Sequence, residues 1–228
     1  MATATALRGE RLSKSYQHYQ VLRDLSFDLA PGACYALFGP NGAGKTTLLK
    51  ILATVHRPSG GRLEIMGRDA VADREAVRRQ LFLVAHGAHL YDDLNAIENL
   101  RFALGLRSLR PADRDIKLAL DRVGIGAFAD LAIRYFSAGM KKRLAIAKAL
   151  LIRPALLLMD EVYASLDEKG VALVNQVIRD ATRAGTAVVL SSHDRARAAE
   201  VADRAGVLRQ GRLHELGITE LLTAHELF

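Results

Sequence analysis

The 228-residue sequence contains no tryptophan, only five prolines and a single cysteine. One cysteine, Cys34, excludes an internal disulfide framework and is typical of a protein from a reducing compartment. Because Cys34 lies in an apolar stretch, we expect it in the core and not as a reactive thiol. The sequence also lacks a run of the roughly 18 apolar residues that a membrane-spanning helix needs, since Lys148 and Arg153 interrupt its most apolar region.

Residues 1–6 lack the positive charge and the apolar core of a signal peptide. We therefore expect a soluble cytosolic chain that is attached to a membrane only through a partner. Half of the residues are hydrophobic, which is enough to bury a substantial core as one domain.

The chain is basic, with a formal net charge of +7. Such a charge is compatible with nucleic acid, an anionic membrane surface or an arginine-rich protein of another kind. The basic residues are spread along the chain and do not cluster with aromatic residues, so we expect no nucleic-acid partner. The densest basic run is Lys141, Lys142 and Arg143. It lies in a predicted helix, and we interpret it as a solvated face.

The most informative segment is residues 39–47, which fits the pattern G-x-x-x-x-G-K-[ST] between an apolar strand and a helix. Its glycines permit positive φ, so successive N–H groups can surround the phosphates of a nucleotide, and the helix dipole adds to that field. Lys45 supplies a cation, and the Thr46 hydroxyl can complete the shell of Mg²⁺. The alternative is a glycine-rich turn with a solvated Lys45. The predicted phosphate-binding residues are Gly39, Pro40, Asn41, Gly42, Ala43, Gly44, Lys45, Thr46 and Thr47.

Two acids follow the apolar residues 156–159, which places Asp160 and Glu161 at the end of a buried strand. A buried acidic pair is costly without a partner, so we expect a cation or a reactive water beside it. Asp160 would orient the water shell of Mg²⁺, and Glu161 would act as a general base. Acids against a helix dipole are the alternative. His193 follows the next apolar strand, from which it can reach a terminal phosphate.

Strands and helices alternate along the chain, which predicts an α/β fold with a parallel-sheet core and its ligand at the carboxyl ends of the strands. Residues 5–36 indicate an amino-terminal antiparallel β subdomain. Helices are expected over 45–55, 168–184, 195–202 and 219–225, and buried strands over 81–85, 156–159 and 187–191. Residues 90–151 read as a helical subdomain inserted into this core. We expect residues 1–228 to form a single domain.

A second predicted helix begins after Phe136, with Ser137 as its N-cap. Taken with residues 39–46, 160–161, 164–167 and His193, this helix start makes the sequence resemble the ATP-binding subunits of ABC transporters, which are P-loop NTPases. The resemblance extends over nearly the whole chain, and its motifs occur in the order and spacing of the family. It is therefore specific.

The resemblance implies a Mg²⁺-dependent ATPase that powers transport through an integral membrane permease, from the cytoplasmic face of the inner membrane. It also implies a homodimer or a paired subunit, because the signature segment contacts the ATP that the phosphate loop of the second subunit holds. Tyr16 matches the aromatic residue that stacks on adenine; without the family it would be a surface strand residue. Asp167 matches a loop that couples the two sites. The signature segment is Ser137, Ala138, Gly139 and Met140.

The sequence departs from the family in two places. His86 stands where the family usually has a glutamine that touches Mg²⁺ and the membrane partner, and residues 136–140 read Phe-Ser-Ala-Gly-Met instead of Leu-Ser-Gly-Gly-Gln. Imidazole is a poorer ligand for Mg²⁺ than an amide oxygen, so a contact of His86 with Mg²⁺ stays open. By the resemblance, His86 is a candidate coupling residue that faces the membrane partner. A metal pair of His86 and His89 has no cysteine to support it.

His86, residues 94–102 and the Ser-Ala-Gly signature together resemble the haem exporter ATP-binding subunit of cytochrome c maturation. Exporters of drugs or polysaccharide share many of these features and remain the alternative. A soluble ABC-type clamp on nucleic acid or ribosomes would usually have two cassettes or long coiled-coil insertions. A P-loop kinase or GTPase is disfavoured because the chain has no Asn-Lys-x-Asp motif.

Overall fold

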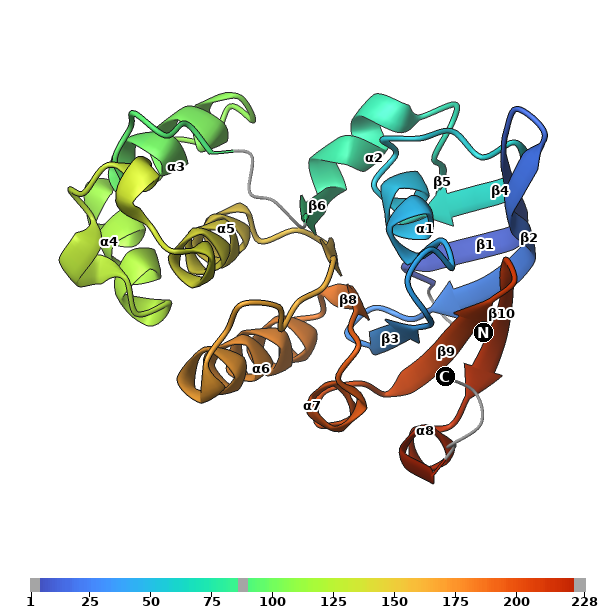
Figure 1. Cartoon of the computed structure of the whole chain (residues 1–228). Coiled ribbons are helices and arrows are strands. Elements are labelled where there is room, and N and C mark those ends of the chain that lie inside the picture. Colours follow the sequence, from blue (N-terminus) through green and yellow to red (C-terminus); the bar gives the residue numbers. More distant parts are fainter. Residues whose placement is uncertain (1–4, 86–89, 224–228) are drawn as a thin grey trace.

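The computed structural model describes residues 5–85 and 90–223, which form two β-sheets and the helices around them (Figure 1). The larger sheet has six strands in the order β10-β9-β3-β8-β7-β6. Strand β10 is antiparallel to β9, and the other pairs are parallel. The bounds are β3 (Cys34–Phe38), β6 (Leu81–Val84), β7 (Leu156–Met159), β8 (Ala187–Ser191), β9 (Arg204–Arg209) and β10 (Arg212–Leu216).

The smaller sheet is antiparallel and has the order β2-β1-β4-β5. Its strands β1 and β2 are long, and they are joined by a tight turn at residues 17–18. The bounds are β1 (Leu7–Tyr16), β2 (Tyr19–Leu29), β4 (Gly60–Ile65) and β5 (Arg68–Asp69). The pairing brings the segment before β3 and the segment after the first helix into one sheet.

The helices lie on both sides of the large sheet. Figure 1 shows α1 and α2 on the side of the small sheet, whereas α3, α4 and α5 gather at the opposite end of the molecule. The α-helices are α1 (Lys45–Leu52), α2 (Arg74–Gln80), α3 (Ala96–Gly105), α4 (Asp113–Arg122), α5 (Ala138–Ile152), α6 (Glu168–Arg183), α7 (Arg195–Ala199) and α8 (Ile218–Thr223). Short 3₁₀ turns occupy Gly126–Phe128 and Ile133–Tyr135. None of the helices in the described ranges is long and apolar enough to cross a bilayer.

Alternation along the central strands creates a hydrophobic core on each face of the large sheet. In β7, Leu157 and Met159 belong to the core shared with α3–α8, whereas Leu156 and Leu158 belong to the core shared with α1 and the small sheet. All four side chains are almost fully buried. Because both faces are covered, the central strands are continuous hydrophobic runs.

The predicted fold class is confirmed: an α/β fold with a parallel core, an antiparallel amino-terminal sheet and helices between β6 and β7. Cys34 is buried, as expected. Strand β7 has its predicted bounds, but α1 ends at Leu52 instead of residue 55, because Thr54 has a positive φ of 56°. The two-residue strand β5 was not predicted.

The interpretation of residues 141–143 as a solvated face is wrong. Lys142 is only 8% exposed, and the Arg143 side chain is 17% exposed, with its guanidinium on Asp167. The first turn of α5 packs against the segment that follows β7, so these two basic side chains point into the protein.

Candidate active site

The loop after β3 turns into α1 through glycines in conformations that other residues rarely adopt. Gly39, Gly42 and Gly44 have φ values of 141°, 79° and 106°. At Gly39 a Cβ atom would also lie 2.3 Å from the carbonyl oxygen of Leu208. The loop therefore needs glycine for both its backbone angles and its close approach to β9.

Lys45 begins α1, and its side chain folds back over this loop. Its ammonium donates to the carbonyl oxygens of Gly39 and Pro40, at 2.7 and 3.2 Å. The Lys45 side chain is 6% exposed, and its Nζ lies 3.8 Å from Oε1 of Glu161. Burial lowers the pKa of Lys45, and the nearby carboxylates of Glu161 and Asp160 oppose that shift. The loop thus holds a cation at the place where a phosphate would enter.

Asp160 lies at the end of β7 and joins α1 to β8. Its Oδ2 accepts a hydrogen bond from the Thr46 hydroxyl at 2.9 Å, and its Oδ1 accepts one from the Ser191 hydroxyl at 2.7 Å. Asp160 is 4% exposed. A carboxylate beside a threonine hydroxyl offers only oxygen donors, which is the chemistry that Mg²⁺ prefers. These residues therefore fit a magnesium ion.

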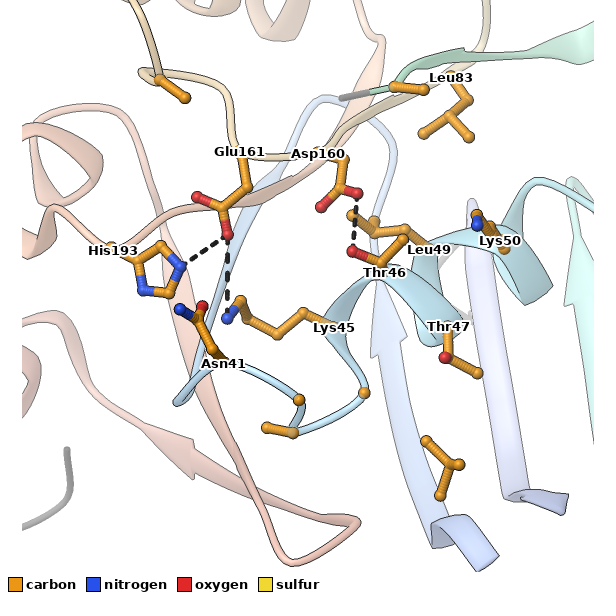
Figure 2. Close-up of a pocket in the computed structure, with 16 residues that line it drawn as sticks. Asn41, Lys45, Thr46, Thr47, Leu49, Lys50, Leu83, Asp160, Glu161 and His193 are labelled. Atoms are coloured by element: carbon orange, nitrogen blue, oxygen red, sulfur yellow. Dashed lines mark hydrogen bonds and ion pairs between the residues drawn. The ribbon is translucent and has the colours of Figure 1, made fainter. Parts of the chain in front are cut away.

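Glu161 follows Asp160 with a positive φ of 48°. Its Oε1 lies 2.9 Å from Nε2 of His193, which comes after β8. Figure 2 shows the carboxylate of Glu161 between Lys45 and His193. A carboxylate in this position can accept a proton from water, and the imidazole of His193 can donate a hydrogen bond to an anionic group bound beside it.

These side chains surround a cavity of about 720 Å³, large enough for a nucleotide. The cavity opens where the carboxyl ends of β3, β7 and β8 meet, the usual ligand position in such sheets. Its lining is Val21, Asn41, Gly42, Ala43, Gly44, Lys45, Thr46, Thr47, Leu49, Lys50, Leu83, Ala85, Asp160, Glu161, Ala164 and His193. The structure thus brings together the residues predicted on three separate strand ends.

The signature segment lies apart from this lining, at the start of α5. Ser137 is the N-cap, and its hydroxyl accepts the Met140 N–H at 3.2 Å. A Cβ on Gly139 would come within 2.8 Å of the carbonyl oxygen of Ser165, so the helix start lies directly against the loop after Glu161. In the ranges 5–85 and 90–223, residues 137–140 do not line the cavity.

Three other predicted residues have different outcomes. Asp167 caps α6: its Oδ1 accepts from the Gly170 N–H and from Arg143, at 2.9 and 2.8 Å. The Gly170 N–H and Arg143 lower the pKa of Asp167. Tyr16 ends β1 and is 43% exposed, with its ring centroid 6.1 Å from that of His56. His86, like His89, lies outside the described residues.

Sequence reasoning missed two contributors to the site. Ser191 connects Asp160 to Glu161, because its hydroxyl also accepts the Glu161 N–H at 2.8 Å. Lys142 donates to the carbonyl oxygens of both acids. The signal for Ser191 was its place at the end of β8, the strand beside β7. For Lys142 the only signal was the basic run of residues 141–143, which suggested a solvated face.

Comparison with protein families decides the class. Residues 22–164 match the family described as ABC transporter. The chain belongs to this family. The match includes the phosphate loop, the helices between β6 and β7, and both acids of the site, so the chain is an ATP-binding subunit of the ABC type.

Curated relatives extend the match over nearly the whole chain. The daunorubicin resistance ATP-binding protein DrrA3 of Streptomyces coeruleorubidus is 33% identical over 96% of this chain and 70% of its own length. The molybdate/tungstate import ATP-binding protein WtpC of Pyrococcus horikoshii is 31% identical over 92% of this chain and 61% of its own length. This chain thus spans about two thirds of the length of such relatives.

Solved structures share the fold. An ATP-binding subunit of an ABC transporter superposes with a TM-score of 0.86 and 28% identity, covering 95% of this chain and 91% of that one. CbiO1 from Clostridium perfringens, part of the ABC transporter complex cbiONQ, gives a TM-score of 0.83 and 25% identity, covering 98% and 92%. An ATP-binding cassette solved as a dimer in a post-hydrolysis state, with ADP and Pi, gives a TM-score of 0.85 at 24% identity, covering 93% and 98%.

Proposed function

We propose that this chain, acting as one ATPase domain over residues 1–228, hydrolyses ATP and drives transport through a separate membrane permease. The observation that carries the proposal is the single cavity in which Lys45, Glu161 and His193 converge beside a phosphate-binding loop (Figure 2). A cation that can bind phosphate, a carboxylate that can accept a proton from water and an imidazole that can donate a hydrogen bond suit phosphoryl transfer to water.

The roles follow from the contacts. The backbone N–H groups of residues 39–47 and the Lys45 ammonium bind the β- and γ-phosphates. Glu161 accepts a proton from the attacking water while the oxygen of that water bonds to the γ-phosphorus. The bond between the γ-phosphorus and the leaving oxygen of ADP breaks. His193 donates a hydrogen bond to the γ-phosphate. Thr46 and Asp160 would hold Mg²⁺, which would neutralise charge on the phosphates. Tyr16 provides a face for adenine.

The second nucleotide contact comes from a second copy of the chain. The signature segment stands outside the cavity of its own chain, yet its Ser137 and its helix N-terminus form an arrangement suited to an anion. We therefore propose a homodimer, or a pair with a similar subunit, in which this segment covers the γ-phosphate held by the partner. The solved dimer with the same fold is compatible with this arrangement.

For the cargo we propose haem export, with His86, residues 94–102 and the Ser-Ala-Gly signature as support. Export of a drug is the second candidate, because the daunorubicin resistance protein is among the relatives. A permease at the cytoplasmic face of the membrane would contact the region of His86. Purification of the complex from native membranes, followed by identification of the attached permease and its bound compound, separates the two. A haem-free, drug-stimulated complex would contradict haem export.

The hydrolysis proposal is tested by steady-state release of phosphate from ATP with Mg²⁺. The wild-type chain should turn over, and Glu161→Gln should bind ATP with unchanged affinity and lose turnover by roughly 10³-fold, the scale expected for loss of a general base. Lys148→Met is the control variant, since Lys148 lies outside the cavity lining. Normal turnover by Glu161→Gln would remove Glu161 from the base role.

A further inference from the structure

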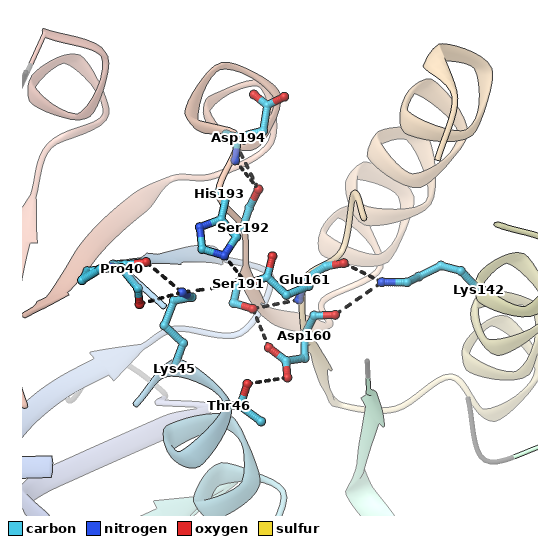
Figure 3. Close-up of polar contacts among 11 residues, drawn as sticks. Pro40, Lys45, Thr46, Lys142, Asp160, Glu161, Ser191, Ser192, His193 and Asp194 are labelled. Atoms are coloured by element: carbon cyan, nitrogen blue, oxygen red, sulfur yellow. Dashed lines mark hydrogen bonds and ion pairs between the residues drawn. The ribbon is translucent and has the colours of Figure 1, made fainter. Parts of the chain in front are cut away.

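A buried lysine connects the helix that carries the signature segment to the backbone of Asp160 and Glu161. Lys142 lies in the first turns of α5 and is 8% exposed. Its ammonium donates to the carbonyl oxygen of Asp160 at 3.4 Å and makes a short hydrogen bond to the carbonyl oxygen of Glu161. Figure 3 shows this side chain reaching from α5 to the end of β7, on the side opposite Lys45.

Burial at this position disfavours the charged form of the Lys142 side chain. Burial lowers the pKa of Lys142, and the carboxylates of Asp160 and Glu161 only partly compensate. Desolvation of a charge is costly unless hydrogen bonds replace the lost water, and a hydrogen bond from a charged donor is stronger than a neutral one. A neutral apolar side chain would fill this position at lower cost, so the charge calls for a role beyond packing.

That role is found in the backbone of Glu161. Its φ of 48° lies in the left-handed region, which is sterically unfavourable for a residue with a Cβ. Such conformations persist where surrounding groups fix them. The Ser191 hydroxyl accepts the Glu161 N–H at 2.8 Å. The carbonyl oxygen of Glu161 accepts hydrogen bonds from the Lys142 ammonium and the Ala164 N–H. Both sides of the residue are therefore held.

The neighbouring Arg143 also connects the start of α5 to surrounding segments through hydrogen bonds. Its guanidinium donates to Oδ1 of Asp167 at 2.8 Å and to the carbonyl oxygen of Val123 at 3.2 Å. The start of α5 is thus tied to both ends of the segment 160–167. A shift of the start of α5 would therefore displace the Glu161 backbone through the hydrogen bond from Lys142.

We propose that Lys142 is a positioning residue for hydrolysis: it holds the Glu161 backbone so that the carboxylate stays between Lys45 and His193, and it links that carboxylate to the signature segment of the same chain. The inference rests on the proposed ATPase function. It predicts that Lys142 affects the chemical step and leaves nucleotide binding alone, because its hydrogen bonds go to the backbone of Asp160 and Glu161 and not to the phosphate-binding residues 39–47.

The test compares Lys142→Met with Lys148→Met, which removes a partly buried ammonium from the same helix. The Lys148 ammonium lies 5.4 Å from the centroid of the Phe82 ring, and burial lowers its pKa as well. For Lys142→Met we expect kcat to fall on the order of 10- to 100-fold, as for a small misplacement of a reacting group, with KM for ATP within about two-fold. Lys148→Met should keep both constants.

A double-mutant cycle separates positioning from general damage to the fold. In a Glu161→Gln background, Lys142→Met should not lower the residual single-turnover rate further. Lys142 acts through the Glu161 carboxylate, which that background already lacks. Unchanged kcat in Lys142→Met, or an equal further loss in that background, would overturn the inference. If Lys142→Met does not fold, the shorter and uncharged Lys142→Gln decides, and wild-type kcat in that variant refutes the role.

The two proposals fail in different ways. Absence of turnover in the wild-type chain contradicts the ATPase proposal itself, and normal turnover in Glu161→Gln removes Glu161 from the base role. Wild-type turnover that depends on Glu161 and not on Lys142 contradicts only the inference.

Discussion

Replacing Lys45 with methionine removes the buried cation of the phosphate loop and keeps a side chain of similar length. The ammonium is held by the carbonyl oxygens of Gly39 and Pro40 and is 6% exposed, so it is already desolvated before a nucleotide arrives. A hydrogen bond that involves a charged group contributes about 1.5–3 kcal/mol. Loss of one such contact to phosphate should raise the Kd for ATP by roughly 10- to 150-fold.

Titration calorimetry measures this change directly. The Kd for ATP should rise as stated, whereas the Kd for adenosine should stay the same, since Lys45 meets only the phosphates. The Lys148→Met variant serves as the matched control and should bind ATP like the wild type. An ATP affinity of Lys45→Met within about two-fold of the wild-type value, far less than one charged hydrogen bond contributes, would refute the phosphate cradle.

Two further predictions concern the supports of the site. Ser191→Ala removes both the donor to Asp160 and the acceptor of the Glu161 N–H, so thermal unfolding should show a loss of about 1–3 kcal/mol, and an unchanged Tm would contradict this. Gly39→Ala would bring a Cβ to 2.3 Å from the carbonyl oxygen of Leu208 at a φ of 141°; ATP binding by calorimetry should be lost, and retained affinity would show that the loop does not need its glycine.

The phosphate loop and the two strand-end acids could be predicted because their signals are local. An apolar run followed by glycines, or by Asp160 and Glu161, marks a strand end whatever the rest of the chain does. The rule that parallel strands present their ligands at one edge then joins these ends. The sequence alone therefore predicts that Thr46, Asp160 and His193 lie near one another.

The burial of Lys142 could not be predicted, because α5 offers no clear polar face. Residues 144–147 of this helix are all buried, so its periodicity does not show which side faces solvent. Lys142 donates to the backbone carbonyl oxygens of Asp160 and Glu161, 18 and 19 residues away. Every residue has a carbonyl oxygen, so the sequence does not indicate which ones a lysine contacts. Ser191 was overlooked for a similar reason, since only the pairing of β7 with β8 gives its hydroxyl a role.

In the proposed dimer, ATP is held between two copies of this chain. Sedimentation of Glu161→Gln, which should bind ATP without splitting it, tests this most directly. We expect a dimer with ATP, a monomer with ADP, and a return to monomer with ATP when Ser137 is also changed to arginine. A strict monomer with saturating ATP, or a dimer that is indifferent to Ser137, would contradict it.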